Sequence, residues 1–253
     1  MTDRAELDEL GEWLHGELAG SEVVETEGWA FDVARRVAER LQSDVPEDAR
    51  LVPVVLWMSE LMAFTAPGRY VYLSRELLQS VCEEGAALAF AHELAHHRLG
   101  HLGGVGRAAS WIRRMPGSSW LALAAQHFEH TFFSPERERD ADRFGFERCL
   151  AVGYDGRKCL SLFRALERRA LDARDLDAVF GPDDIERLAG EELAELEGEV
   201  SVLTRPLRSL RRAARVGWEK RRGYPTLRER RMALEQGPAT EVRAASTRRP
   251  PRP

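Results

Sequence analysis

A His-Glu-x-x-His motif within a long helical stretch constrains this sequence more than any other feature. Residues 84–99 are rich in alanine and leucine and contain no proline, which predicts a helix. Residues four apart share one face of a helix, so His92 and His96 point the same way. Two neutral imidazoles placed in this way can bind one Zn²⁺ at about 2.0–2.1 Å. Glu93 is close enough to accept a proton from a metal-bound water, and the combination indicates metal-assisted hydrolysis.

A catalytic zinc site needs a third protein ligand as well as an open position for water. A segment that begins like a helix, with Ser134 as its cap and proline at its first position, carries several acids. These candidates are Glu136, Glu138, Asp140 and Asp142. Glu138 and Asp142 are four residues apart and share a face, so one can bind zinc while the other orients a histidine ring.

Other interpretations of the histidine motif are possible. Two histidines on one helix face can form a hydrogen-bonded pair in the core, and a motif this short also arises by chance. A metzincin site would need glycine and histidine where this chain has Leu99 and Leu102. His97 lies off the metal-facing side and is expected at the surface, while His101 is expected to pack at the helix end.

The composition excludes several classes of function. The 253 residues suit one large domain or a domain with a helical extension. The net charge of −5 gives no general attraction to nucleic acid, and the basic segment 205–222 is expected to be a solvated face. No run reaches the roughly 18 apolar residues of a membrane span, and the N-terminus lacks an apolar signal core. Three cysteines without C-x-x-C spacing predict reduced thiols and a cytoplasmic location.

Hydrophobic periodicity and turn residues predict an α+β fold, a mainly helical domain with a small β-sheet packed against the motif helix. Helices are expected at 3–19, 28–43, 75–81, 84–99, 135–151, 156–170 and 224–235, and strands at 51–57, 61–65 and 69–74. Pro53 indicates an edge or a bulge in the first strand. The domains are expected to be N-terminal helices (1–45), a core domain (46–236) with an insert at 103–133 and a helical segment at 156–222, and a disordered tail (237–253).

Five segments together resemble the HtpX-type and CAAX prenyl protease family of gluzincin metallopeptidases, metallopeptidase family forty-eight. The segments are 62–68 with 70–78, 91–101, 138–145, 153–155 and 224–235. In order, they are similar to the family's strand pair, its H-E-x-x-H helix with a trailing histidine, its E-x-x-A-D segment, the turn that follows, and its H-P-x-T-x-x-R helix. The resemblance covers most of the chain.

The resemblance implies a zincin-like fold and a role for each matched residue. His92, His96 and Glu138 would bind one Zn²⁺ per chain, and Glu93 would act as the general base. Asp142 would orient a ligand without binding the metal itself. Arg230 would steady a substrate carbonyl or the tetrahedral oxyanion.

The chain departs from the family pattern in three ways. Tyr224 stands where the family usually has histidine, although a phenol can still donate a hydrogen bond to the reacting group. Met62 replaces a common asparagine. The membrane helices of the best-known members are missing, which removes the argument for membrane substrates.

The sequence therefore predicts a soluble zinc-dependent endopeptidase that hydrolyses a peptide or unfolded protein through a zinc-activated water. The alternative is a catalytically weak or inactive protein of the same fold that acts as a binding or scaffold module. The intact Glu93 favours the enzyme, because a degenerate site is expected to lose its base first. No nucleic-acid partner and no integral membrane segment are expected, and the sequence makes no prediction of an oligomeric state.

Overall fold

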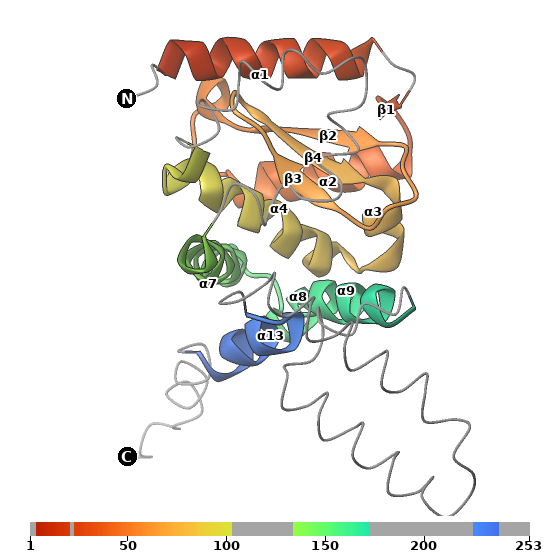
Figure 1. Ribbon diagram of the computed structural model, residues 1–253, viewed down its shortest axis with the longest axis vertical. Helices are drawn as coiled ribbons and strands as arrows, with labels where there is room; N and C mark the ends of the chain where they lie inside the picture. The colour runs from red at the N-terminus through yellow and green to blue at the C-terminus, as the bar shows by residue number, and fades with distance from the viewer. Residues whose placement is uncertain (1–3, 21–22, 103–133, 173–224, 238–253) are drawn as a thin grey trace, which may run out of the picture. The chain divides into compact units, whose positions relative to one another are not determined.

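The computed structural model describes residues 4–20, 23–102, 134–172 and 225–237 (Figure 1). Its helices are α1 (Arg4–Ala19), α2 (Trp29–Leu41), α3 (Arg75–Ser80), α4 (Glu83–Arg98), α7 (Pro135–Ala151), α8 (Gly156–Cys159), α9 (Ser161–Asp172) and α13 (Leu227–Gln236), with a 3-10 turn, η1, at Glu47–Ala49. Its strands are β1 (Val24–Glu25), β2 (Val52–Leu56), β3 (Ala63–Thr65) and β4 (Tyr70–Ser74). The chain divides into two compact units, Met1–Leu162 with Leu234–Pro253, and Phe163–Ala233.

The strands form one sheet in the order β1-β2-β4-β3. β2 and β4 are parallel, whereas β1 pairs antiparallel with β2 and β3 pairs antiparallel with β4. β2 therefore lies between β1 and β4 in the sheet order, but Pro53 is on a part of β2 that has no outer neighbour in the described sheet, so the prediction of an edge holds at that residue. Proline is tolerated there because β1 pairs only with Val55 and Leu56, so the outer side of Pro53 faces no partner strand within the described sheet.

Helices cover both faces of the sheet (Figure 1). Leucines spaced one turn apart on α1 pack with side chains from the upper face of the sheet, and these residues are Leu10, Leu14, Leu18, Phe64 and Tyr72. α2 contacts β2 on the opposite face, and α4 contacts β3 and β4 there. The result is a layered unit in which α4 lies directly beneath the edge strand β3.

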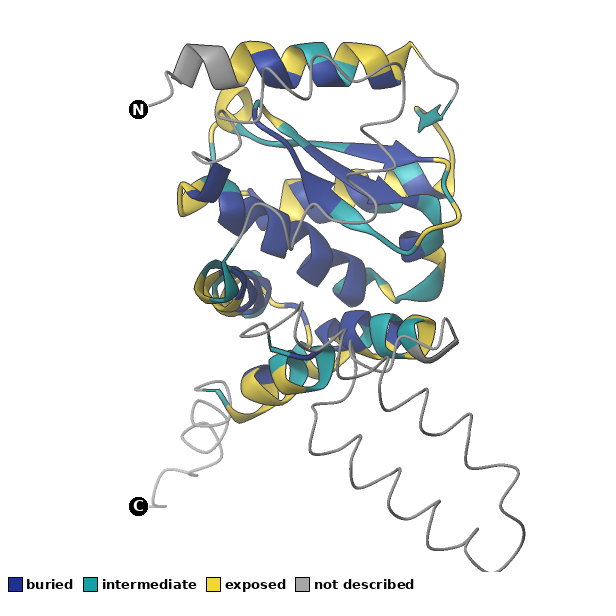
Figure 2. Cartoon of the chain, viewed as in Figure 1, coloured by how far each residue is buried: buried dark blue, intermediate teal, exposed yellow. Residues whose placement is uncertain are grey.

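α4 is the most deeply buried helix of the first unit, as Figure 2 shows by its almost unbroken dark blue. Every residue from Gly85 to His96 is buried. This stretch of the helix has no face exposed to solvent because the sheet, α2 and α7 all pack against it. Small side chains make this possible, since five of the buried residues are alanines (Ala86, Ala87, Ala89, Ala91 and Ala95).

α7 approaches α4 closely enough to require glycine at their crossing. A Cβ atom on Gly145 would lie 2.9 Å from the backbone nitrogen of His92 and 3.0 Å from the carbonyl carbon of Ala91. These neighbours are backbone atoms within a buried helix, so they cannot move aside easily. Gly145 therefore sets the distance between the two helices beside the histidine motif.

The α+β prediction is confirmed at the level of a mainly helical chain with a small sheet packed on the motif helix. The predicted helix at 156–170 is two helices, α8 and α9, separated at Leu160. The insert at 103–133 lies outside the described residues, as do most of the segment 156–222 and the tail beyond 237. The predicted domain division at residue 45 stays a prediction.

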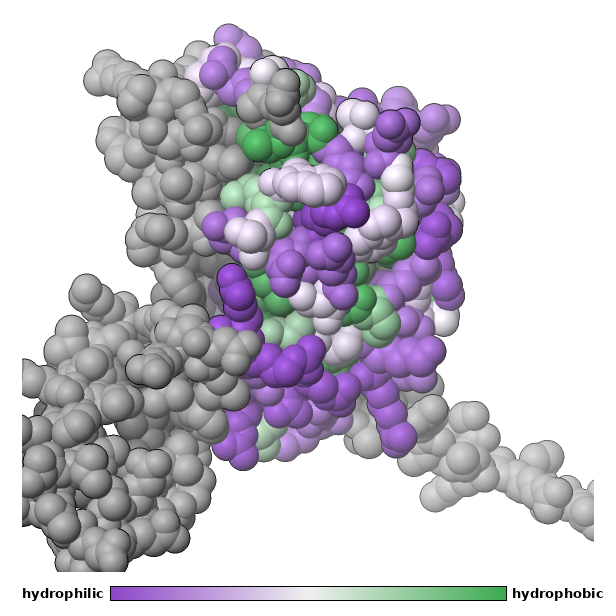
Figure 3. All heavy atoms as spheres, turned by 90° about the vertical axis from the view of Figure 1, so that its right-hand side faces the viewer, coloured by the Kyte–Doolittle hydropathy of each residue, from purple (hydrophilic) through white to green (hydrophobic). Residues whose placement is uncertain are grey.

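The face of the molecule drawn in Figure 3 is mostly hydrophilic, with small separate hydrophobic areas. Two tryptophans of the first unit are exposed, Trp29 and Trp57, and the guanidinium of Arg75 lies over both rings.

Among the described helices, none combines the length and the apolar character that crossing a membrane requires.

The substitution Gly145→Ala tests the helix crossing. We expect it to lower the free energy of unfolding by about 1–3 kcal/mol through overpacking, despite the better helix propensity of alanine. The matched control is Gly16→Ala in α1, where a Cβ would meet nothing within 4 Å. Because Gly16 is exposed, we expect this control substitution to raise the free energy of unfolding by up to about 1 kcal/mol. Urea unfolding measures the free energy of unfolding of each variant. Equal stability of the two variants would contradict the claim that the crossing of α4 and α7 requires glycine at position 145.

Candidate metal centre

The two helices that cross at Gly145 bring three potential ligands together. α4 carries His92 and His96 one turn apart, both buried. α7 begins where the Ser134 side chain accepts a hydrogen bond from the backbone N–H of Arg137. Glu138 lies in the first turn of this helix, where the helix dipole favours an acid, and it is 2% exposed. The cap at Ser134 sets the start of α7 and therefore the position of the Glu138 carboxylate beside α4.

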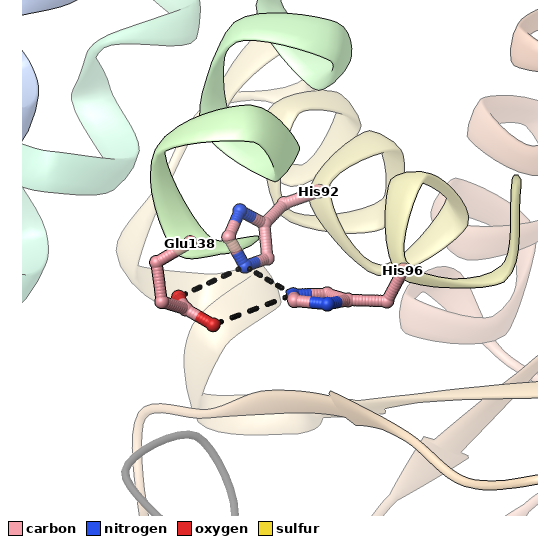
Figure 4. Close-up of side chains that lie close together, drawn as sticks. All are labelled: His92, His96 and Glu138. Carbon is pink, nitrogen blue, oxygen red and sulfur yellow. Dashed lines mark hydrogen bonds and ion pairs between the residues drawn. The ribbon is translucent and has the colours of Figure 1, made fainter. Parts of the chain in front are cut away.

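The three side chains converge on one point (Figure 4). The Nε2 atoms of His92 and His96 are 3.1 Å apart. Glu138 Oε2 lies 3.4 Å from His92 Nε2, and Glu138 Oε1 lies 3.5 Å from His96 Nε2. Ligands about 2.0–2.1 Å from a tetrahedral zinc ion are about 3.3–3.4 Å from one another, so these spacings fit such an ion. The donor set of two imidazoles and one carboxylate also suits zinc.

Asp142 lies one turn beyond Glu138 and contacts His92 on the side away from the other ligands. Its Oδ1 is 2.9 Å from His92 Nδ1. Burial acts to lower the pKa of His92, but the hydrogen bonds and charges of Asp142 and Glu138 outweigh it and raise that pKa well above its ordinary value. With Nδ1 in contact with Asp142, Nε2 of His92 faces Glu138 and His96.

His101 contacts the other histidine ligand, and the sequence did not predict this contact. Its Nδ1 lies 3.0 Å from His96 Nδ1. α4 ends at Arg98, and Gly100 has a φ of 69°, a left-handed conformation that turns the chain back toward the helix. The sequence carried a signal for it, because a glycine just after a helix followed by a histidine places that side chain beside the last turn.

His97 is not at the surface, contrary to the prediction. It is partly buried, and its Nε2 hydrogen-bonds the hydroxyl of Thr65 on β3. Thr65 Oγ1 donates to the carbonyl of Tyr70 at 3.0 Å, so it accepts from His97. Burial, assisted by the charge of Arg98, lowers the pKa of His97 to about 4, which keeps the ring neutral. The contact joins the motif helix to the edge strand.

The remaining predicted site residues lie in different places. Glu93 is buried on α4, next to His92. Arg230 belongs to the second compact unit, where its guanidinium carbon lies 5.5 Å from the centre of the Phe163 ring. Tyr224 lies outside the described residues. The roles predicted for these three residues stay predictions.

Within the described residues, the buried acids and buried histidines all belong to α4, α7 or the turn after α4. The acids are Glu93, Glu138 and Asp142, and the histidines are His92, His96 and His101. Buried ionisable groups are costly unless they serve one another or a metal, so a single buried cluster of this kind indicates a functional site.

An H-E-x-x-H helix whose histidines meet a glutamate from a second helix is an arrangement typical of metallopeptidases. The model of one protein family, Peptidase family M48, matches residues 25–248, and the chain belongs to this family. The comparison with curated proteins found no match. The family confirms the resemblance seen in the sequence.

Metal analysis of the purified protein tests the centre directly. We expect one zinc ion per chain and little zinc in Glu138→Gln, because the amide is a much weaker ligand than the carboxylate. The matched control is Glu136→Gln on the same turn of α7, whose side chain is 71% exposed and pairs with Arg139. Equal zinc contents of the two variants would remove Glu138 from the site.

Asp142→Asn tests the support of His92. Loss of the carboxylate charge is expected to weaken zinc binding by about 10- to 100-fold, measured by competition with a coloured chelator. Asp140→Asn is the control, since Asp140 lies on the exposed side of the same helix and pairs with Arg143. If both variants lose affinity equally, the cause is the general charge of α7 rather than the contact with His92.

Proposed function

We propose that this chain is a zinc-dependent endopeptidase with a zincin-like fold, which uses His92, His96 and Glu138 as metal ligands. The observation that carries the proposal is the convergence of these three buried side chains, with Glu93 on the same helix. The family supports it, because a metallopeptidase acts on peptide bonds. We expect the substrate to be a peptide or an unfolded protein.

The residues of the chain have separate roles in the proposed reaction. Zinc, when bound, supplies a Lewis acid that lowers the pKa of a water molecule toward ~7. Glu93 accepts the proton of the attacking water and delivers it to the leaving amine nitrogen. Asp142 holds His92 in the orientation that binding requires. Arg230 and Tyr224 are proposed, from the resemblance alone, to stabilise the oxyanion.

The edge strand β3 offers a place for an extended substrate. The backbone N–H of Ser74 donates to the carbonyl oxygen of Met62 at 3.0 Å, so these two residues form a hydrogen-bonded pair. Hydrogen-bonded pairs alternate along an antiparallel ladder, so the next one joins Phe64 to Tyr72 of β4. The backbone groups of Ala63 and Thr65 then point away from β4, toward the side on which the described part of the sheet has no further strand. A peptide can pair with these groups as an added strand. The hydrogen bond from His97 to Thr65 ties this edge to the helix that carries the ligands.

Cleavage of casein by the wild type and by Glu93→Gln tests the proposed function. We expect Glu93→Gln to keep its zinc and to lose activity by about 100- to 10,000-fold, because an amide cannot accept the proton. Glu83→Gln is the control, since Glu83 is in the first turn of the same helix and pairs with Arg36 near the surface.

Two outcomes would contradict the proposal in different ways. Full activity of zinc-loaded Glu93→Gln would show that Glu93 is not the base. A zinc-loaded wild type that cleaves neither casein nor unstructured peptides would instead favour the alternative, a binding or scaffold module that keeps the metallopeptidase fold.

A further inference from the structure

We propose that His101 is a positioning residue that accepts the Nδ1 proton of His96 and so holds His96 in the tautomer that binds the metal through Nε2. The inference rests on the proposed zinc site and adds a residue to it. It begins with one distance, the 3.0 Å between the two Nδ1 atoms. Two ring nitrogens at this separation share one proton, so one is the donor and the other the acceptor.

The surroundings of His96 decide which ring donates. Its Nε2 faces Glu138 Oε1 at 3.5 Å and His92 Nε2 at 3.1 Å, which is the position of the expected metal ion. A ligand nitrogen must present a lone pair, so the proton of neutral His96 is on Nδ1. Nδ1 of His101 is then the acceptor, and its own proton is on Nε2. The rings meet at 66°, an edge-on arrangement that suits this hydrogen bond.

Two contacts hold His101 in place for this role. The left-handed turn at Gly100 directs the chain back over the last turn of α4. From the other helix, Arg137 Nη1 donates to the carbonyl oxygen of His101 at 3.1 Å. Arg137 directly precedes Glu138, so the same turn of α7 supplies one ligand and anchors the residue that orients another. His101 is 7% exposed, which protects the hydrogen bond from competition by water.

Three substitutions at this position separate hydrogen bonding from simple packing. His101→Asn places an amide oxygen where Nδ1 was and keeps the acceptor. His101→Leu fills a similar volume without an acceptor. His101→Gln is polar, but its amide reaches the position of Nε2 rather than that of Nδ1. Zinc affinity is measured for each by chelator competition, together with the wild type and with His15→Leu, a control at a half-buried histidine on α1 that stacks on Tyr70.

We expect His101→Leu and His101→Gln to bind zinc about 10- to 100-fold more weakly than the wild type, and His101→Asn and His15→Leu to stay near it. Nitrogen-15 NMR of the zinc-loaded protein gives a second readout. The Nδ1–H signal of His96 should resist exchange with water in the wild type and in His101→Asn, and exchange rapidly in His101→Gln. Should the leucine variant fail to fold, the asparagine and glutamine variants carry the comparison.

Several results would overturn the inference. One is that His101→Gln or His101→Leu binds zinc with the affinity of the wild type. Another is that His101→Asn loses as much zinc affinity as these two variants do. An equal loss in His15→Leu would show that the effect is not specific to this contact. Each of these leaves the proposed function standing if the wild type binds zinc and cleaves casein. A wild type that binds no zinc would overturn both the inference on His101 and the proposed function.

Discussion

The close contact of α7 with α4 is the constraint on which the rest of the structure depends. The buried face of α7 runs through Glu138, Asp142 and Gly145, residues at four- and three-residue steps that lie along one stripe of the helix. At Gly145 the stripe meets the backbone of α4, and at its other end it supplies two carboxylates to the histidines. A bulkier residue at the crossing would move the carboxylates as well, so packing and site geometry are set by the same interface.

Building a site here requires burying ionisable groups in a tightly packed interior. Carboxylates and imidazoles lose hydration on burial, and the loss is offset only when they hydrogen-bond to one another or bind a metal. Four groups of the cluster meet this condition through the contacts of His92 with Asp142 and of His96 with His101, and Glu138 would meet it by binding the proposed metal ion. The alanines of α4 and the hydrophobic sheet around it keep the backbone in place, so the ligands stand on rigid elements rather than on loops.

Local signals in the sequence were sufficient for most of the described helices but not for the break at Leu160 or for the contacts between distant residues. The cap at Ser134 and the H-E-x-x-H spacing predicted the helices and the pair of ligands on one face. The two-residue strand β1 is too short to show a periodicity in the sequence. The place of β2 in the sheet depends on its pairing with β4, and β3 lies between these two strands in the sequence. Of the four acids after Ser134, spacing singled out Glu138 and Asp142 as a pair on one face, and only the resemblance selected Glu138 as the ligand. The contacts of His97 and His101 depend on where β3 and the turn at Gly100 lie in three dimensions.

The two histidines of the proposed metal site have different partners, and the difference has an electrostatic consequence. His92 contacts a carboxylate, Asp142, whereas His96 contacts a neutral imidazole, His101. In the proposed zinc site, the carboxylates of Glu138 and Asp142 would together match the charge of a divalent ion. Glu93 is already a third buried carboxylate in this cluster, so a fourth in place of His101 would add further negative charge to a buried site and make a bound water less acidic. A neutral acceptor would hold the ring of His96 without that cost, and Glu93 would remain the carboxylate that takes up a proton in the proposed reaction.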